Sequence, residues 1–172
     1  MAAAIALGVP PDYARRRALR RVREPGQLAY IGADTQQRPQ FLTPHAARAW
    51  SALREAAQRD AIELQVVSGF RSIAYQLGIL QRKLERGQTI AEILAVSASP
   101  GYSEHHSGRA LDLTTPGFAP LDEEFERSDA FAWLAGNARR FRFYLSFPRG
   151  NRHAIAYEPW HWCWRARPAV RR

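Results

Sequence analysis

The chain has 172 residues, of which 46% are hydrophobic, and its 25 basic and 16 acidic side chains give a formal net charge of +9. This length fits one domain with one core, and no apolar run approaches the ~20 residues that a membrane-spanning helix needs. The single cysteine excludes an internal disulfide, and the basic balance favours an anionic partner such as nucleic acid, an anionic wall polymer or a membrane surface.

Residues 1–42 are expected to form a basic helix and an extension. The apolar start, residues 1–10, has no basic residue before it and therefore predicts no clear secretory signal. Residues 12–23 place an apolar stripe among arginines, which predicts a short helix capped by Asp12. That helix is either a solvated face or a patch for an anionic polymer, and no aromatic residues interleave to stack bases. Residues 27–42 predict a turn-rich segment.

Residues 43–172 are expected to form one compact domain. The periodicity and the capping residues predict helices over residues 44–59, 73–86, 90–97 and 129–140. Short alternating or apolar runs predict strands over residues 62–67, 108–113, 141–147 and 161–164. Helices come first and most strands later, so we expect an α+β fold in which N-terminal helices pack on a small, mainly antiparallel sheet.

Two short motifs carry residue types suited to metal chemistry. Residues 103–112 contain His105, His106 and Asp112, and residues 158–161 contain His161. A catalytic zinc site takes three protein ligands and keeps one open position. Asp112 lies in an apolar strand and needs a partner there, either a metal ion or an arginine, because burying a lone carboxylate costs several kcal/mol.

The economical ligand set is His105 or His106 together with Asp112 and His161. Strand alternation places His106 on the same face as Asp112 and so favours His106. Gly108 can break that alternation, because glycine adopts backbone dihedrals that other residues avoid. The residues alone leave the choice between the two histidines open.

The two motifs together resemble a known family signature. Ser103-x-His105-x-x-Gly108-x-Ala110-x-Asp112, followed by Glu158-x-Trp160-His161, is similar to the pattern of the zinc D-alanyl-D-alanine carboxypeptidases and dipeptidases, which include the vancomycin-resistance enzymes. The loop at residues 68–72, with Gln76 after it, resembles the substrate-binding arginine loop of that family. The resemblance covers roughly residues 43–164.

The resemblance implies roles for individual residues. The first histidine of the motif is the ligand in this family, so His105, Asp112 and His161 are expected to bind one Zn²⁺, with Glu158 as general base. His106 is expected to lie behind the site or to line the pocket.

Four further residues are expected to contact the substrate. Arg71 is expected to stabilise the oxyanion or to bind the terminal carboxylate, since its fork of donors suits either group. Ser103 either binds the substrate carboxylate or caps a turn. Gln76 and Trp160 complete this set.

The expected function is removal of the terminal D-alanine from peptidoglycan stem peptides. An L,D-carboxypeptidase, a D,D-dipeptidase or a phage-type wall endopeptidase would share these motifs, and a zinc-containing binding module is an alternative without catalysis. We expect a monomer with no specific nucleic-acid partner, whose arginines contact the anionic wall. The family resemblance implies the cell envelope or periplasm, whereas the lack of a clear signal leaves a cytoplasmic or phage-borne protein open.

Overall fold

The computed structural model describes residues 2–166 and contains two antiparallel sheets. The larger sheet has four strands in the order β3-β4-β6-β5, which are β3 Gln65–Ser68, β4 Ala110–Thr114, β6 His161–Trp164 and β5 Phe143–Leu145. The smaller sheet is a hairpin of β1 Ala29–Ala33 and β2 Pro39–Leu42.

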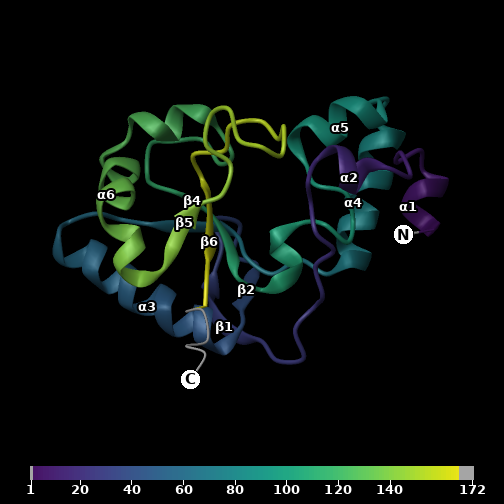
Figure 1. Ribbon diagram of the computed structural model, residues 1–172. Helices are drawn as coiled ribbons and strands as arrows, with labels where there is room; N and C mark the ends of the chain where they lie inside the picture. The colour runs from purple at the N-terminus through teal and green to yellow at the C-terminus, as the bar shows by residue number, and fades with distance from the viewer. Residues whose placement is uncertain (1, 167–172) are drawn as a thin grey trace, which may run out of the picture.

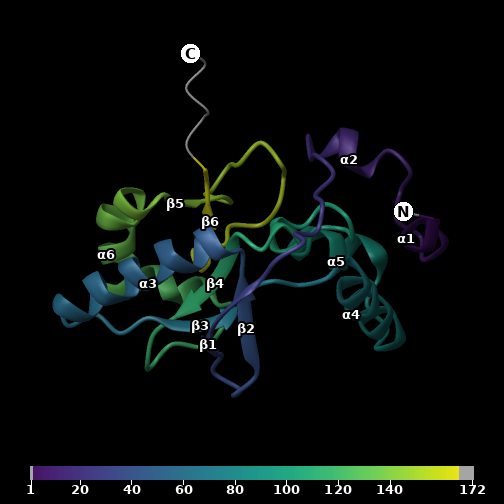
Figure 2. The same ribbon diagram turned by 90° about the horizontal axis from the view of Figure 1, so that it is seen from below.

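Helices form groups on two sides, of which the first packs on the larger sheet and the second shares a separate core beside it (Figures 1 and 2). One side carries α3 Pro44–Arg59 and α6 Asp129–Asn137. The other side carries α1 Ala2–Ala6, α2 Tyr13–Arg16, α4 Ile73–Glu85 and α5 Ile90–Val96. Three short 3₁₀ helices complete the elements, η1 Glu104–Ser107, η2 Glu123–Arg127 and η3 Ala138–Phe141. Within residues 2–166 no helix combines the length and the apolar character needed to cross a membrane. The α+β fold is confirmed.

The main core lies between the sheet and α3 and α6. Trp50 and Leu53 of α3 are almost fully buried, as the helical spacing predicts, and they join Leu111 of β4 and Trp162 of β6 in one cluster. Leu111 and Trp162 are direct cross-strand partners. Because successive side chains of a strand point to opposite faces, the neighbouring pair Asp112 and His161 faces away from this core.

A second, smaller hydrophobic cluster joins the N-terminal segment to α4 and α5. Ala4, Val9 and Tyr13 are buried against Leu80 of α4 and Ile93 of α5. Both α4 and α5 begin at a side-chain cap. The Ser72 side chain caps α4, and a capping box of Thr89 and Glu92 opens α5.

The predicted helix over residues 12–23 is wrong in its length. The helix ends at Arg16, and Ala18 has a φ of 48°. Asp12 makes no cap bond; its carboxylate instead accepts from Arg16 Nε at 2.6 Å. The arginine-rich run has too few apolar positions to hold a longer helix against tertiary contacts, and the chain turns so that Val22 N donates to Gly101 O at 2.8 Å.

The segment over residues 27–42 forms the β1–β2 hairpin rather than an irregular stretch. Gly32 lies inside β1, where the register shifts between Tyr30 and Gly32. A glycine within β1 and a proline at the start of β2 hide the strand pattern in the sequence, although both are compatible with a bulged edge hairpin. The arginine-rich tail beyond residue 166 lies outside the described residues. The boundary that we expect at residue 42 stays a prediction.

Candidate metal centre

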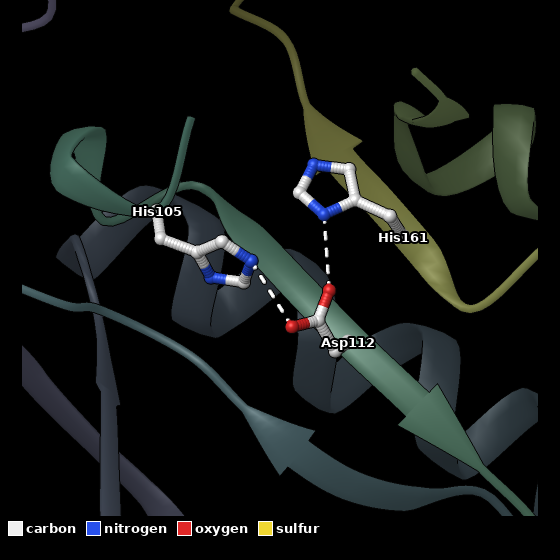
Figure 3. A group of neighbouring side chains, drawn as sticks. All are labelled: His105, Asp112 and His161. Carbon is white, nitrogen blue, oxygen red and sulfur yellow. Dashed lines mark hydrogen bonds and ion pairs between the residues drawn. The ribbon is translucent and has the colours of Figure 1, made fainter. Parts of the chain in front are cut away.

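Three neighbouring elements carry the motif residues. His105 lies in η1, Asp112 on β4 and His161 on β6 (Figure 3). Gly108 ends η1 with a φ of 63°, and a Cβ there would lie 3.2 Å from Thr43 N. This left-handed turn lets the chain pass from η1 into β4, which favours glycine at the position.

The three side chains form a buried group on the face of the sheet opposite the main core. Their exposed fractions are 2% for His105, 4% for Asp112 and 3% for His161, and one ligand atom from each lies within 4.8 Å of the others. Figure 3 shows the Asp112 carboxylate between the two imidazoles. His161 Nδ1 lies 3.0 Å from Asp112 Oδ1, and His105 Nε2 lies 3.1 Å from Asp112 Oδ2.

The environment of His105 determines which nitrogen carries its hydrogen. His105 Nδ1 lies 2.6 Å from the carbonyl oxygen of Gly69, which can only accept, so Nδ1 is the donor. Burial, and then the charge of Arg71, lower the pKa of His105 to about 4, so the ring is neutral at pH 7. Its Nε2 therefore holds a lone pair, and this buried atom has no hydrogen-bond partner because its approach to Asp112 is not aligned as a hydrogen bond.

Glu104 orients the ring of His161 through Nε2, whereas the ring of His105 is oriented through Nδ1. His161 Nε2 donates to Glu104 Oε2 at 3.0 Å, which leaves Nδ1 facing Asp112. Burial opposes a charge on His161, but the bonds to Asp112 and Glu104 raise its pKa to about 10. Burial likewise opposes the charge on Glu104, and His161 lowers the Glu104 pKa to about 2. The motifs predict no role for Glu104, although an acidic residue beside a motif histidine is a signal of a supporting role.

The donor set fits a metal ion. Two imidazole nitrogens and a carboxylate are ligands that Zn²⁺ accepts. Burial opposes ionisation of Asp112, but His105 and His161 keep the pKa of its carboxyl well below its usual range. An unpartnered buried lone pair on His105 Nε2, facing an ionised carboxylate, is unfavourable unless a cation lies between them. The second nitrogen of each ring already has a protein acceptor, as metal-binding histidines usually do.

His106 does not take part in this group, so the strand-alternation argument for it is wrong. Residues 104–107 form a 3₁₀ turn, in which alternation does not apply. His106 Nδ1 lies 2.7 Å from Arg71 O, and Gly101 N donates to His106 Nε2 at 3.1 Å. His106 therefore connects two loops behind the site.

Glu158 lies beside the group. Its Oε2 is 3.8 Å from His161 Nδ1, and the residue is 8% exposed. Burial raises the pKa of Glu158 to about 7; His161 opposes this rise and Asp112 adds to it. A carboxyl group that gains and loses a proton near neutral pH is suited to general acid–base work.

The group forms part of the wall of a cavity of about 460 Å³. All eight predicted site residues line this cavity: Arg71, Gln76, Ser103, His105, Asp112, Glu158, Trp160 and His161. Arg71 Nη2 lies 3.5 Å from Asp112 Oδ2, and its Nη1 donates to Gln76 Oε1 at 3.3 Å. The Ser103 side chain accepts from His105 N at 3.3 Å, so Ser103 caps η1 as well as lining the cavity.

Comparison with known proteins gives the family. The VanY family, described as D-alanyl-D-alanine carboxypeptidase, matches residues 39–167. YodJ of Bacillus subtilis (strain 168), whose name marks it as an inferred carboxypeptidase, is 33% identical over 127 residues, which are 70% of this chain and 45% of YodJ. A D-alanyl-D-alanine carboxypeptidase of Enterococcus faecalis (strain ATCC 700802 / V583) is 32% identical over 120 residues, which are 64% of this chain and 43% of that protein. This chain thus spans less than half the length of these curated relatives.

Solved structures agree with this assignment. The LD-carboxypeptidase LdcB superposes with a TM-score of 0.73 at 28% identity, covering 82% of this chain and 69% of LdcB. A mutant of the vancomycin-resistance D,D-pentapeptidase VanY, solved in complex with Zn(II), superposes with a TM-score of 0.61 at 25% identity, covering 83% of this chain and 82% of that one. From the matched residues and the shared fold, the chain belongs to the VanY family of D-alanyl-D-alanine carboxypeptidases.

Proposed function

We propose that this chain is a zinc-dependent carboxypeptidase that removes the terminal D-alanine from peptidoglycan stem peptides. His105, Asp112 and His161 would hold the zinc ion. The observation that carries the proposal is the buried lone pair of His105 Nε2, which converges with His161 Nδ1 on the Asp112 carboxylate in the wall of a cavity. When bound there, zinc would polarise the scissile carbonyl and acidify a water molecule.

Glu158 is the proposed general base and then general acid. It takes a proton from the attacking water as the new C–O bond forms at the peptide carbonyl. It then gives this proton to the amine nitrogen as the C–N bond breaks. Its position beside His161 Nδ1, within the cavity, supports this role.

Arg71 is proposed to stabilise the negative charge that develops on the carbonyl oxygen, or to bind the terminal carboxylate. Its guanidinium is held near Asp112 by Gln76, and planar donors of this kind suit an oxyanion or a carboxylate. Gln76, Ser103 and Trp160 are proposed to contact the substrate, because each lines the same cavity.

The second candidate is L,D-carboxypeptidase activity on tetrapeptide stems. The TM-score to the LD-carboxypeptidase LdcB, 0.73, exceeds the 0.61 to the D,D-pentapeptidase. Incubation of the zinc-loaded protein with a stem pentapeptide, with a stem tetrapeptide and with the free dipeptide D-alanyl-D-alanine, followed by mass spectrometry, separates the two. Loss of one D-alanine from the pentapeptide supports the D,D assignment, and loss from the tetrapeptide alone supports the L,D assignment. Cleavage of the free dipeptide D-alanyl-D-alanine alone identifies a dipeptidase, and no product from any of the three substrates, with zinc bound, favours a binding module.

The residue roles are tested with two matched pairs of variants. Glu158→Gln is expected to keep zinc and lose roughly 10²–10⁴-fold in kcat, as the loss of a general base does, whereas the exposed control Glu124→Gln is expected to keep both. His105→Ala is expected to lose zinc, measured by metal analysis after gel filtration, and His106→Ala to retain it. Normal turnover by Glu158→Gln would contradict the base assignment.

A further inference from the structure

The β1–β2 hairpin connects to the metal centre through hydrogen bonds. Most of this hairpin lies before residue 39, where the family match begins, and its sequence predicts no functional role. Asp34, in the turn between β1 and β2, is nevertheless 3% exposed, and its side chain is fully buried. A buried carboxylate this far from the cavity needs an explanation.

Hydrogen bonds lead from this carboxylate to His105 through the Gln40 amide and the backbone N and O of Gly69. His105 Nδ1 donates to Gly69 O at 2.6 Å, and Gly69 N donates to Gln40 Oε1 at 2.8 Å. Gln40 Nε2 donates in turn to Asp34 Oδ2 at 2.8 Å. Every donor in the series points toward Asp34. Gly69 N and Gly69 O belong to the two peptide groups on either side of the Gly69 Cα, so the series acts by fixing the backbone of Gly69.

Three further hydrogen bonds hold the Asp34 carboxylate in place. Its Oδ1 accepts from Gln36 N at 2.8 Å and from Arg38 N at 3.0 Å, and its Oδ2 also accepts from Arg38 Nε at 2.8 Å. These bonds close the hairpin turn and hold the carboxylate in one orientation. The amide of Gln40 is therefore oriented as well, with its nitrogen toward Asp34 and its oxygen toward Gly69.

The peptide group between Gly69 and Phe70, whose oxygen meets His105, is also held against β2. Phe70 N donates to Phe41 O at 2.8 Å, and a Cβ on Gly69 would lie 2.8 Å from that same oxygen. Gln40 and Phe41 thus bind two successive peptide N–H groups of the loop. The carbonyl that meets His105 Nδ1 can neither rotate nor withdraw without breaking these bonds.

We propose that Gln40 and Asp34 are positioning residues for His105, and that the hairpin acts as part of the metal centre. By fixing the Gly69 carbonyl, they keep the hydrogen of His105 on Nδ1 and the lone pair of Nε2 directed at Asp112. The inference rests on the proposed function, in which His105 is a zinc ligand. Its consequence is that zinc affinity depends on side chains that do not touch the ion.

The test compares two glutamines of the hairpin. Gln40→Met removes both hydrogen bonds at similar side-chain length, and Gln36→Met is the control, because the Gln36 side chain is exposed and only its backbone N bonds to Asp34. Zinc affinity is measured by competition with a chromophoric chelator, on variants first shown to be folded by circular dichroism. We expect Gln40→Met to bind zinc about 10–100-fold more weakly and Gln36→Met to match the wild type.

A second set of variants, in which the carboxylate and the amide exchange positions, separates hydrogen bonding from packing. Gln40→Glu alone places two carboxylates face to face and is expected to weaken zinc binding. Adding Asp34→Asn places a donor opposite the new acceptor but removes the acceptor of Arg38 Nε, so we expect the double variant to recover part of the affinity. Long-range ¹H–¹⁵N spectra of the zinc-loaded forms should show His105 protonated at Nδ1 in the wild type and in the double variant.

Two outcomes would overturn the proposal. Wild-type zinc affinity in Gln40→Met refutes it, as does a double variant no better than Gln40→Glu. His105→Ala, measured in the same assay, distinguishes this failure from failure of the proposed function. If His105→Ala loses zinc while Gln40→Met keeps it, only the positioning role is wrong, whereas retention by His105→Ala refutes the ligand assignment itself.

Discussion

Replacement of Gly69 by alanine provides a quantitative test of how tightly the Arg71 loop packs on β2. Gly69 has no left-handed φ, so alanine could adopt its backbone conformation without strain. Alanine at such a site normally stabilises a protein by about 0.4–1 kcal/mol, because it restricts the unfolded chain. At Gly69, however, the added Cβ would lie 2.8 Å from Phe41 O and 3.4 Å from Gln40 Oε1.

Neither oxygen can move away freely. Phe41 O accepts from Phe70 N, and Gln40 Oε1 accepts from Gly69 N, both at 2.8 Å. Overpacking of this kind costs about 1–3 kcal/mol, which exceeds the gain from restricting the unfolded chain. We therefore expect Gly69→Ala to lower the free energy of unfolding by about 1–2 kcal/mol, which corresponds to roughly 2–4 °C in Tm for each kcal/mol.

Gly136 supplies the matched control. It lies on the exposed side of α6, and a Cβ there would meet no atom within 4 Å. Gly136→Ala is expected to raise stability by about 0.5–1 kcal/mol, since glycine is unfavourable inside a helix. The assay is urea unfolding of the zinc-free variants followed by circular dichroism. A Gly69→Ala protein as stable as the wild type would refute the packing argument.

Three further predictions concern single side chains. Lys83 lines the cavity, where its ammonium group can pair with a substrate carboxylate, so Lys83→Met should raise KM for peptides with a free C-terminal carboxylate by about 10-fold. Lys83→Arg should retain the low KM, and equal KM values for all three proteins would contradict a role in binding. Burial opposes ionisation of Asp34, but bonds from Arg38 and Gln36 keep its pKa below the usual range. The stability that this carboxylate contributes is present above the unfolded pKa of about 4 and is lost as pH falls through the lower folded pKa, so the stability difference between wild type and Asp34→Asn should shrink in urea titrations below pH 4. Burial, and then Glu104, raise the pKa of the Cys163 thiol, so a thiol reagent should modify it much faster in urea than in the folded protein.

Local signals in the sequence predict the long elements well. Trp50, Leu53 and Ala57 identify the buried face of α3, and the structure gives this helix the bounds expected from Thr43 and Pro44. The hairpin was missed because a bulge at Gly32 and a proline at the start of β2 disrupt the two-residue period on which strand recognition depends.

At the site, as in the hairpin, sequence periodicity fails where the chain departs from a regular strand. Alternation assumes an extended chain through residues 104–109 and therefore favoured His106, whereas the chain there makes a 3₁₀ turn that Gly108 ends. The family resemblance pointed to His105, whose Nε2 does face Asp112. Glu104 stands beside a motif histidine in the sequence, but the histidine that it bonds is the distant His161, and Gln40 acts on His105 only through the backbone of Gly69, so spacing alone identifies neither contact.

The direct pairing of Asp112 with His161 makes strand alignment a condition for the chemistry. These two residues stand opposite each other on β4 and β6, with Leu111 and Trp162 beside them on the other face. A slip of one residue would turn one strand over relative to the other, which would place either the Asp112 carboxylate or the His161 imidazole in the core and its apolar neighbour at the cavity. Misaligned forms therefore lose both core and ligands at once, so metal binding would report directly on whether the sheet has assembled correctly.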